Sequence, residues 1–368
     1  MKILVTGSDG FIGKNLCLML KENGYNKICK INRNTSNEKL KKELKTADFV
    51  YHLAGINRHN DPKMFDVVNI DFTKFILDSL KNYNNNAPVM FASSTQVNNN
   101  SDYGKSKLAA EKLINDHSKN NNSLIYIYRL PNIFGKWCKP NYNSFVSTFC
   151  HNFINDKEIV IHDENAPVSL VYIDDLCNDL IKLLKNNEKS DFRNVKPQYN
   201  TTVGEVANII TSFKDSKNLL IEDVGSGLTR ALYSTYLSYL EPLNFKYTLP
   251  SYKDERGIFC EMLKTKNSGQ FSFFTAYPGI TRGGHYHHSK NEKFLVIKGT
   301  ALFNFKNIVT GEKYSIEVTS EKCEVVITIP GWSHDIKNIG DDELIVMLWA
   351  NEIFDKENPD TLLDDLSK

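Results

Sequence analysis

Short hydrophobic runs alternate with longer amphipathic stretches through the first half of the chain. Strand-like runs begin at Lys2, Lys27, Ala47, Pro88 and Leu124. The first four are followed by helix-like segments at residues 15–23, 37–46, 64–82 and 103–117. Strands that alternate with helices at this spacing are typical of a doubly wound parallel sheet. The alternation continues more loosely to about residue 243, so we predict an α/β domain over residues 1–243.

The hydrophobic pattern changes class at about residue 244. Beyond it, short β-rich runs are separated by turn residues. No long segment with the hydrophobic period of a helix interrupts these runs before the C-terminal tail. The runs are at residues 259–265, 270–277, 293–306, 313–319, 323–330 and 343–354. Such spacing is typical of an all-β sandwich or barrel. We therefore predict a second, all-β domain over residues 244–368.

Composition indicates an ordinary globular protein of two domains. The chain has 368 residues, of which 41% are hydrophobic and 24% charged, and its formal net charge is +1. This charge gives no general attraction to nucleic acid or to an anionic membrane, so we expect neither as a partner. There is no secretory signal pattern, and no apolar run is long enough to span a bilayer. The seven cysteines contain no CxxC pair, which favours reduced thiols and a cytoplasmic location.

A glycine pattern between the first strand and the first helix indicates a dinucleotide site. Gly7, Gly10 and Gly13 form GxxGxxG, which lets backbone N–H groups approach a pyrophosphate. The position after the second strand reads Asn32-Arg33 instead of the usual acid, which favours a 2′-phosphate and hence NADPH. A structural glycine turn and a solvated Arg33 are the simpler alternatives. The cofactor-binding residues predicted in this first part of the chain are Gly7, Asp9, Gly10, Phe11, Ile12, Gly13, Asn32 and Arg33.

Tyr103 and Lys107 are the strongest catalytic candidates of the first domain. Residues four apart lie on one face of a helix, and Ser94 ends the strand before that helix. A lysine ammonium lowers the pKa of a nearby tyrosine, so the phenol can exchange a proton with a substrate. A serine at Ser94 could hold a carbonyl oxygen. We predict Ser94, Tyr103 and Lys107 as catalytic residues, with Tyr103 and Lys107 also contacting the cofactor.

These motifs resemble the extended short-chain dehydrogenase/reductase family, whose fold is a Rossmann-type sheet. HLAG at 52–55 and RLPNIFG at 129–135 stand where that family has its third-strand motif and its entry to the substrate region. The resemblance implies that Leu53, Ala54 and Gly55 line the cofactor and that Asn132 lies near a sugar nucleotide. Asn98 departs from the aromatic residue that many members carry, which leaves Ser93 and Thr95 as alternatives to Ser94.

Three histidines within four positions mark the second domain. On a strand, residues two apart share a face, so His285 and His287 point together and His288 points away. Two imidazoles with the carboxylate of Glu292 suit a divalent first-row metal, zinc most readily. His334, in IPGWSHDIKN, is the expected fourth ligand from a distant strand. A metal-free sugar-binding surface and an ordinary buried His334 are the alternatives.

The spacing of these residues resembles the two motifs of the cupin family, a family of β-barrels. The first motif fits without a gap, whereas Pro330 and Gly331 are adjacent where the second motif usually has one residue between them. KDERGIFCEM at 253–262 is similar to deoxysugar epimerases of the cupin fold. By that resemblance Arg256 contacts a phosphate or sugar oxygen of the substrate; a surface arginine is the alternative.

The fused order of the two halves resembles the CapF family of capsular polysaccharide enzymes. The stretches 132–145, 234–240 and 287–299 carry this resemblance, which covers nearly the whole chain. It implies a homodimeric enzyme that acts on a UDP-linked 4-keto-2-acetamido-2,6-dideoxyhexose. The cupin domain would invert C3, and the reductase domain would then reduce C4 with NADPH to give UDP-N-acetyl-L-talosamine, on the route to UDP-N-acetyl-L-fucosamine. Two alternatives remain open: a single-activity reductase whose cupin serves dimerisation or stability, and a regulatory sensor that binds NADP(H) without turnover.

Overall fold

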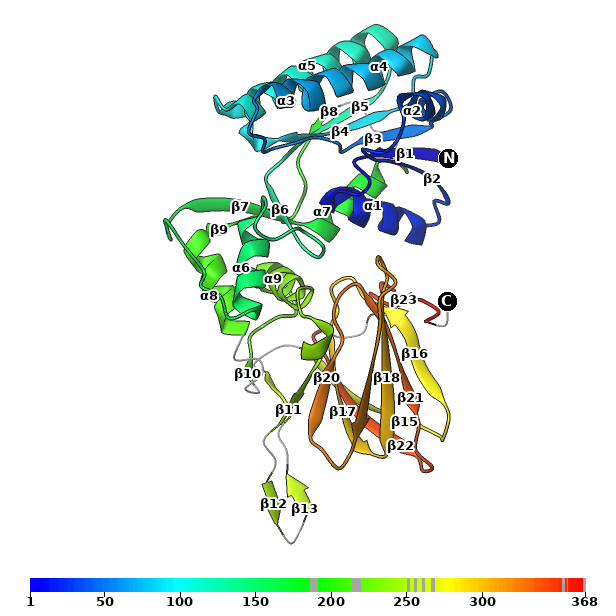
Figure 1. The fold of residues 1–368 in the computed structure, drawn as a ribbon, viewed down its shortest axis with the longest axis vertical. Helices are drawn as coiled ribbons and strands as arrows, with labels where there is room; N and C mark the ends of the chain where they lie inside the picture. Colours follow the sequence, from blue (N-terminus) through cyan, green and yellow to red (C-terminus); the bar gives the residue numbers. More distant parts are fainter. Residues whose placement is uncertain are drawn as a thin grey trace. The chain divides into compact units, whose positions relative to one another are not determined.

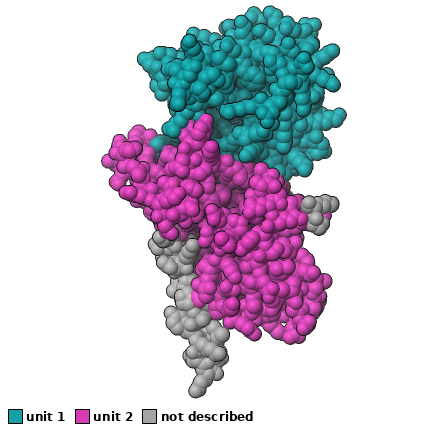
Figure 2. All heavy atoms as spheres, viewed as in Figure 1, with its two compact units in different colours: residues 1–133, 168–200 teal, residues 134–167, 201–368 magenta. Residues whose placement is uncertain are grey.

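The computed structural model describes residues 1–185, 191–213, 220–249, 252–254, 257–259, 262–265, 269–352, 355 and 357–366. The described chain forms two compact units, one of residues 1–133 and 168–200 and the other of residues 134–167 and 201–368 (Figure 2). The second unit thus includes helical segments that precede the β-rich region. The functional boundary near residue 243 stays a prediction.

The first unit contains a six-stranded sheet of order β2-β1-β3-β4-β5-β8, in which all five strand pairs are parallel (Figure 1). Its strands are β1 (Lys2–Thr6), β2 (Lys27–Ile31), β3 (Phe49–His52), β4 (Val89–Ser94), β5 (Ile125–Leu130) and β8 (Asp191–Arg193). Strands β1, β3 and β4 are almost wholly buried because helices cover both faces of the sheet. The doubly wound α/β fold predicted from the sequence is therefore confirmed.

The helices of this unit divide between the two faces of the sheet. Helices α1 (Phe11–Glu22) and α7 (Ile173–Lys182) pack together on one face (Figure 1). Helices α2 (Asn37–Leu44), α4 (Phe72–Asn82) and α5 (Asp102–Asn121) cover the other, over a core that includes Leu4, Ile76 and Ile114. The short helices α3 (Lys63–Phe65), η1 (Asp66–Asp71) and η2 (Thr95–Asn98) lead into α4 and α5. Segments predicted as helices from their periodicity are thus helical.

The second unit contains two five-stranded antiparallel sheets that face each other. One has the order β11-β20-β17-β22-β15 and the other the order β19-β18-β21-β16-β23 (Figure 1). Aromatic side chains fill the space between them, as where Phe294 meets Phe303 and Phe245 meets Trp332. The strands are β11 (Lys246–Thr248), β15 (Gln270–Ala276), β16 (Thr281–Tyr286), β17 (Glu292–Lys298), β18 (Thr300–Asn307), β19 (Lys313–Thr319), β20 (Glu324–Ile327), β21 (Trp332–Asn338), β22 (Leu344–Ala350) and β23 (Leu362–Leu363).

Helical and short β elements complete the chain. The second unit also has α6 (Phe145–Ile154), α8 (Val203–Ser212), α9 (Gly227–Leu237) and η4 (Pro242–Asn244). The short strands are β6 (Asn132–Phe134), β7 (Pro167–Tyr172), β9 (Tyr199–Thr202), β10 (Leu220–Ile221), β12 (Tyr252–Asp254), β13 (Gly257–Phe259) and β14 (Lys264–Thr265). Among the described residues, no helix has the length and apolar character needed to cross a membrane.

Candidate active site and metal centre

The glycine pattern forms a tight turn from β1 into α1. Gly7 has φ +67°, and its carbonyl accepts a 2.9 Å hydrogen bond from the N–H of Gly10. A Cβ on Gly13 would lie only 2.2 Å from the Gly7 carbonyl oxygen, so this position needs glycine. Gly10 is the N-cap of α1 and offers no side-chain cap to the first-turn amides. Those amides, with the positive end of the helix dipole, suit a pyrophosphate.

The other residues predicted for the cofactor gather at the same edge of the sheet, where β1, β2 and β3 end. The Asn32 amide donates to the Asp9 carboxylate at 2.8 Å, and Arg33 is exposed beside them. The Ala54 N–H donates to the Thr6 hydroxyl at 3.1 Å. A Cβ on Gly7 would lie 2.9 Å from the Cα of Ala54, so the two loops touch. The carboxyl end of a parallel sheet is the usual nucleotide position in this fold.

Ser94 and Tyr103 meet between the end of β4 and the first turn of α5. The Ser94 side chain is near enough to Tyr103 to oppose the rise in the pKa of the phenol that burial causes. Ser101 caps α5 by accepting the N–H of Gly104 at 3.0 Å, which fixes the start of the helix next to η2. The alternative Ser93 donates to the Glu111 carboxylate at 2.5 Å instead. The geometry therefore favours Ser94 over Ser93 as the partner of Tyr103.

Lys107 lies one turn beyond Tyr103 and is buried. Its Nζ donates to the Ala92 carbonyl at 2.8 Å and lies 4.8 Å from the centre of the Phe91 ring. Burial lowers the pKa of Lys107 to about 8, although the nearby Glu111 carboxylate opposes the shift. The amine therefore changes its charge close to neutral pH.

The expected lowering of the tyrosine pKa is wrong for this structure. Burial raises the pKa of Tyr103 above its usual value, and the Ser94 side chain only partly offsets this. The prediction assumed that Lys107 acts directly on the phenol, but its Nζ is instead bonded to the Ala92 carbonyl. A protonated Tyr103 is suited to donating a proton to a developing alkoxide.

Asn69, on the π-helical turn η1, supports this active-site edge. Its amide nitrogen donates to the Ile56 carbonyl and to the Ser106 hydroxyl, each at 2.9 Å, and its oxygen accepts the Ile56 N–H. The side chain thereby ties the loop after β3 to α5. A Cβ on Gly55 would lie 3.0 Å from the Lys107 Nζ and 3.1 Å from the Asn69 oxygen. The resemblance to the extended short-chain dehydrogenase/reductase family already marks Asn69 as a structural asparagine, whereas Ser106 was not predicted, because its partner Asn69 is 37 positions away.

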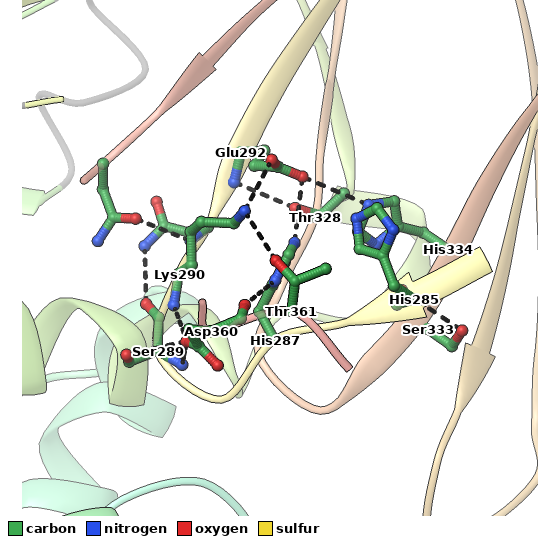
Figure 3. A network of polar contacts seen from close by, with 12 residues as sticks. His285, His287, Ser289, Lys290, Glu292, Thr328, Ser333, His334, Asp360 and Thr361 are labelled. Atoms are coloured by element: carbon green, nitrogen blue, oxygen red, sulfur yellow. Dashed lines mark hydrogen bonds and ion pairs between the residues drawn. The ribbon is translucent and has the colours of Figure 1, made fainter. Parts of the chain in front are cut away.

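The four predicted metal ligands come together in the second unit. One ligand atom from each of His285, His287, Glu292 and His334 can be chosen so that all lie within 4.8 Å of one another (Figure 3). The Glu292 Oε2 lies 3.2 Å from the His287 Nε2 and 3.4 Å from the His334 Nε2. His287, Glu292 and His334 are buried, and His285 is half-buried.

Strand pairing explains how distant residues converge. His285 on β16 pairs directly with His334 on β21, and Glu292 begins β17 of the facing sheet. A bulge between Gly283 and His285 shifts the register of β16. β16 ends at Tyr286, so His287 lies just beyond the strand, yet its ring still joins the cluster. His288 is outside the cluster, and its ring lies 5.8 Å from that of Tyr286.

Burial favours the neutral imidazoles of His285 and His334, and the neighbouring histidines keep the Glu292 carboxylate ionised. Burial lowers the pKa of His285 to about 3, and the neighbouring His334 and His287 add to the shift. Burial also lowers the pKa of His334. Burial alone would raise the pKa of Glu292, but its contacts with His287 and His334 hold that pKa well below its usual range. Neutral imidazole and ionised carboxylate are the forms that bind metals.

Hydrogen bonding of His287 supports a metal in the cluster. The His287 Nδ1 meets the backbone carbonyl of Asp360, which can only accept, so Nδ1 carries the proton. When the His287 Nε2 carries no proton it is an acceptor, and it faces the Glu292 Oε2 at 3.2 Å. Two acceptors at this distance fit a shared cation, and a ligating histidine usually donates its other N–H in this way. The four residues therefore fit a divalent metal such as zinc.

The two residues predicted to bind substrate have different standing. Asn132 begins β6 and is exposed. Arg256 lies outside the described residues.

Sequence reasoning also missed Asp360, Thr361 and Lys290, which surround the His287 turn (Figure 3). Asp360 and Thr361 are about 70 positions away along the chain. No local pattern marks such residues.

Comparisons with known proteins agree with both halves of the chain. Residues 3–200 match the NAD dependent epimerase/dehydratase family, and residues 252–362 match the polysaccharide biosynthesis C-terminal domain. A Pseudomonas aeruginosa protein described as UDP-2-acetamido-2,6-beta-L-arabino-hexul-4-ose reductase is 50% identical over 363 residues, which cover 98% of each chain. The crystal structure of capsular polysaccharide assembling protein CapF from Staphylococcus aureus is 36% identical, with a TM-score of 0.68, and covers 99% of this chain and 100% of that chain.

The chain belongs to the CapF family. The resemblance inferred from the sequence is thereby confirmed, together with the order of a Rossmann-type domain followed by an antiparallel β domain. UDP-glucuronic acid 4-epimerase from Bacillus cereus, solved with NAD, is 23% identical with a TM-score of 0.53 and covers 58% of this chain and 84% of that chain. At this identity the similarity shows the fold alone.

Proposed function

We propose that this CapF family member is an NADPH-dependent reductase of a UDP-linked 4-keto-2-acetamido-2,6-dideoxyhexose. The observation that carries the proposal is the placement of Ser94 at the end of β4 next to Tyr103 in the first turn of α5, with Lys107 buried one turn away. A proton donor at the carboxyl edge of a nucleotide-binding sheet suits reduction of a ketone. The name of the Pseudomonas aeruginosa relative supports a 4-keto sugar as substrate.

Each predicted residue has a physical role in this reaction. Bound NADPH supplies the hydride. The amides of the Gly7–Gly13 turn hold its pyrophosphate, and the exposed Arg33 suits its 2′-phosphate. Ser94 orients the ketone oxygen, and Tyr103 donates a proton to it as the alkoxide forms. Asn132 is proposed to contact the sugar nucleotide.

The β domain, which we assign to the cupin family, is proposed to epimerise C3 of the same sugar. His285, His287, Glu292 and His334 would hold a divalent metal, most readily zinc. A bound metal supplies positive charge that stabilises an enolate. A proton next to a ketone is acidic, and this acidity is lost when the ketone is reduced, so epimerisation must precede reduction. After both steps the product would be UDP-N-acetyl-L-talosamine, on the route to UDP-N-acetyl-L-fucosamine. We further propose that the enzyme is a homodimer and that the two functional domains meet near residue 243 of the chain.

The decisive experiment follows the product by NMR in heavy water with the UDP-4-keto sugar and NADPH. For the parent protein we expect deuterium at C3 and oxidation of NADPH. Tyr103→Phe should slow NADPH oxidation by about 100-fold while deuterium still enters C3, because only the proton donor is lost. The double variant His285→Ala, His287→Ala should lose the exchange at C3 and retain NADPH binding.

Matched variants and opposite outcomes make this test specific. Tyr83→Phe and His162→Ala alter exposed residues and should behave as the parent does. Retained turnover in Tyr103→Phe contradicts the proton-donor role. Unchanged C3 exchange in the histidine variant contradicts the epimerase and favours a single-activity reductase. An absence of any turnover in the parent favours a regulatory sensor.

A further inference from the structure

The carboxylate of Asp360 holds the turn that follows β16. It accepts the backbone N–H of His288 at 2.8 Å and those of Ser289 and Lys290, each at 2.7 Å (Figure 3). It also accepts the Ser289 hydroxyl at 3.1 Å. Three consecutive amides that converge on one carboxylate form a strong, charge-assisted contact. Burial opposes ionisation of Asp360, but His287, His288 and these amides hold its pKa below the usual range.

The backbone of the same residue contacts a metal ligand directly. The Asp360 carbonyl accepts the His287 Nδ1–H and so directs Nε2 toward Glu292. The next residue, Thr361, lies 3.3 Å from the Lys290 Nζ through its hydroxyl, and that Nζ is 3.5 Å from the Glu292 Oε1. Asp360 and Thr361 thus reach two of the four ligands, one of them through Lys290.

Pairing of β23 with β16 extends this contact to a third ligand. Leu363 pairs with His285 and Leu362 with Tyr286, and the Asp364 N–H donates to the Gly284 carbonyl at 2.9 Å. The segment 360–364 therefore runs along the chain from Gly284 to Lys290. The segment therefore supports His285 and His287, the two ligands that lie on neither β17 nor β21.

We propose that Asp360 is a positioning residue of the metal centre. By anchoring the turn 288–290, Asp360 sets the tautomer and the orientation of His287. This inference rests on the metal site proposed above. His287 lies beyond the end of β16, so strand pairing does not fix its ring. The bonds of the Asp360 carboxylate to the turn hold two backbone segments together. One is the backbone of Asp360, whose carbonyl accepts the His287 Nδ1–H, and the other is the backbone of residues 288–290. Outer contacts of this kind typically change metal affinity by about 10- to 100-fold.

The test is zinc affinity by chelator competition in the full-length protein, with Asp360→Asn as the variant. Asparagine keeps the shape but turns an N–H₂ group toward amide donors, so the turn should loosen and zinc should bind about 10- to 100-fold more weakly. Asp364→Asn is the matched control, because the Asp364 carboxylate pairs with Lys306 at 3.1 Å and not with the turn. Its zinc affinity should equal that of the parent.

A cobalt(II) spectrum separates positioning from simple loss of stability. The visible bands of the cobalt-loaded Asp360→Asn protein should shift, because the orientation of His287 changes, and those of Asp364→Asn should not. Should Asp360→Asn fail to fold, Ser289→Ala removes one of the four bonds to Asp360 and should weaken zinc binding several-fold. A parent that binds zinc, with affinity and spectrum unchanged in the Asp360 and Ser289 variants, overturns this proposal alone. A parent without stoichiometric zinc overturns the metal site as well.

Discussion

Lys107 links a measurable pKa to the proposed reduction. Its buried Nζ has a pKa of about 8, so the ammonium is lost as pH rises through that value. If the reaction needs the ammonium one helical turn from Tyr103, kcat/KM for NADPH-dependent reduction should fall about tenfold per pH unit above pH 8. A pH profile of kcat/KM checks this. A profile that stays flat to pH 10 contradicts a role for the ammonium.

The stability of the protein should move in the opposite direction over this range. The pKa of Lys107 is lower in the folded protein than the usual 10.5, so between about pH 8 and 10.5 the unfolded chain binds more protons at this residue. Its contribution therefore makes the folded state more stable as pH rises. A loss of rate above pH 8 with undiminished unfolding temperature separates ionisation from unfolding. Lys107→Arg should move the descending limb to higher pH, since a guanidinium keeps its charge.

At the scale of single residues, the sequence predicted ligands better than their supports. Tyr103 and Lys107 are four apart, so the helical period places them on one side of α5. The ligand set of the second domain was also predicted, although His287 joins the cluster from just beyond the end of β16 and not through strand alternation. Asp360 has no such signal, because its partners are about 70 positions away and are mostly backbone amides. The direction of the Tyr103 pKa was also missed, since burial is a tertiary property.

At the scale of elements, the close approach of α5 to η2 should control the active site. Gly104 follows Tyr103, and a Cβ there would lie 2.3 Å from the Gln96 carbonyl and 2.9 Å from the Asn99 carbonyl. Gly104→Ala should therefore push α5 from η2 and separate Tyr103 from Ser94. We expect NADPH oxidation to fall by more than about tenfold and stability by about 1–3 kcal/mol.

The neighbouring substitution Lys105→Ala is the matched control for this element. Lys105 is exposed in the same helical turn, and alanine favours a helix. Rate and unfolding midpoint, measured by NADPH absorbance and by denaturant titration, should match the parent. A fully active Gly104→Ala protein contradicts the control of Tyr103 by helix position.

Element boundaries followed from the sequence where periodicity was clear. The predicted helix at 37–46 is observed at Asn37–Leu44, and the strand at 27–32 at Lys27–Ile31. The run 293–306 was read as one stretch, but it divides at Gly299, whose φ of +92° breaks β17 from β18. Strand order and the pairing of His285 with His334 depend on the closed arrangement of two sheets. Such long-range pairing has no local signature.

At the scale of the whole molecule, the two proposed activities rest on separate compact units. The Ser94–Tyr103–Lys107 set lies in residues 1–133, and the four predicted metal ligands lie in residues 201–368. The proposed dinucleotide site and the proposed metal site thus lie in units that have their own cores. This separation predicts that the proposed epimerase activity can be removed without loss of NADPH binding by the first unit.

Removal of the metal is the direct way to test that separation. After treatment with dipicolinate and gel filtration, deuterium exchange at C3 should be lost, while NADPH still binds with unchanged affinity by fluorescence. Zinc should restore exchange and, at about 100 times its Kd, should stabilise the unit that holds it by about 2.7 kcal/mol against unfolding. Magnesium should do neither, because it prefers oxygen ligands and this cluster has three histidines.

Exchange that survives with less than a tenth of an equivalent of metal would show that the histidines act without an ion. In that case the acceptor pair of His287 and Glu292 must share a proton instead, because the Nδ1–H of His287 is already donated to Asp360.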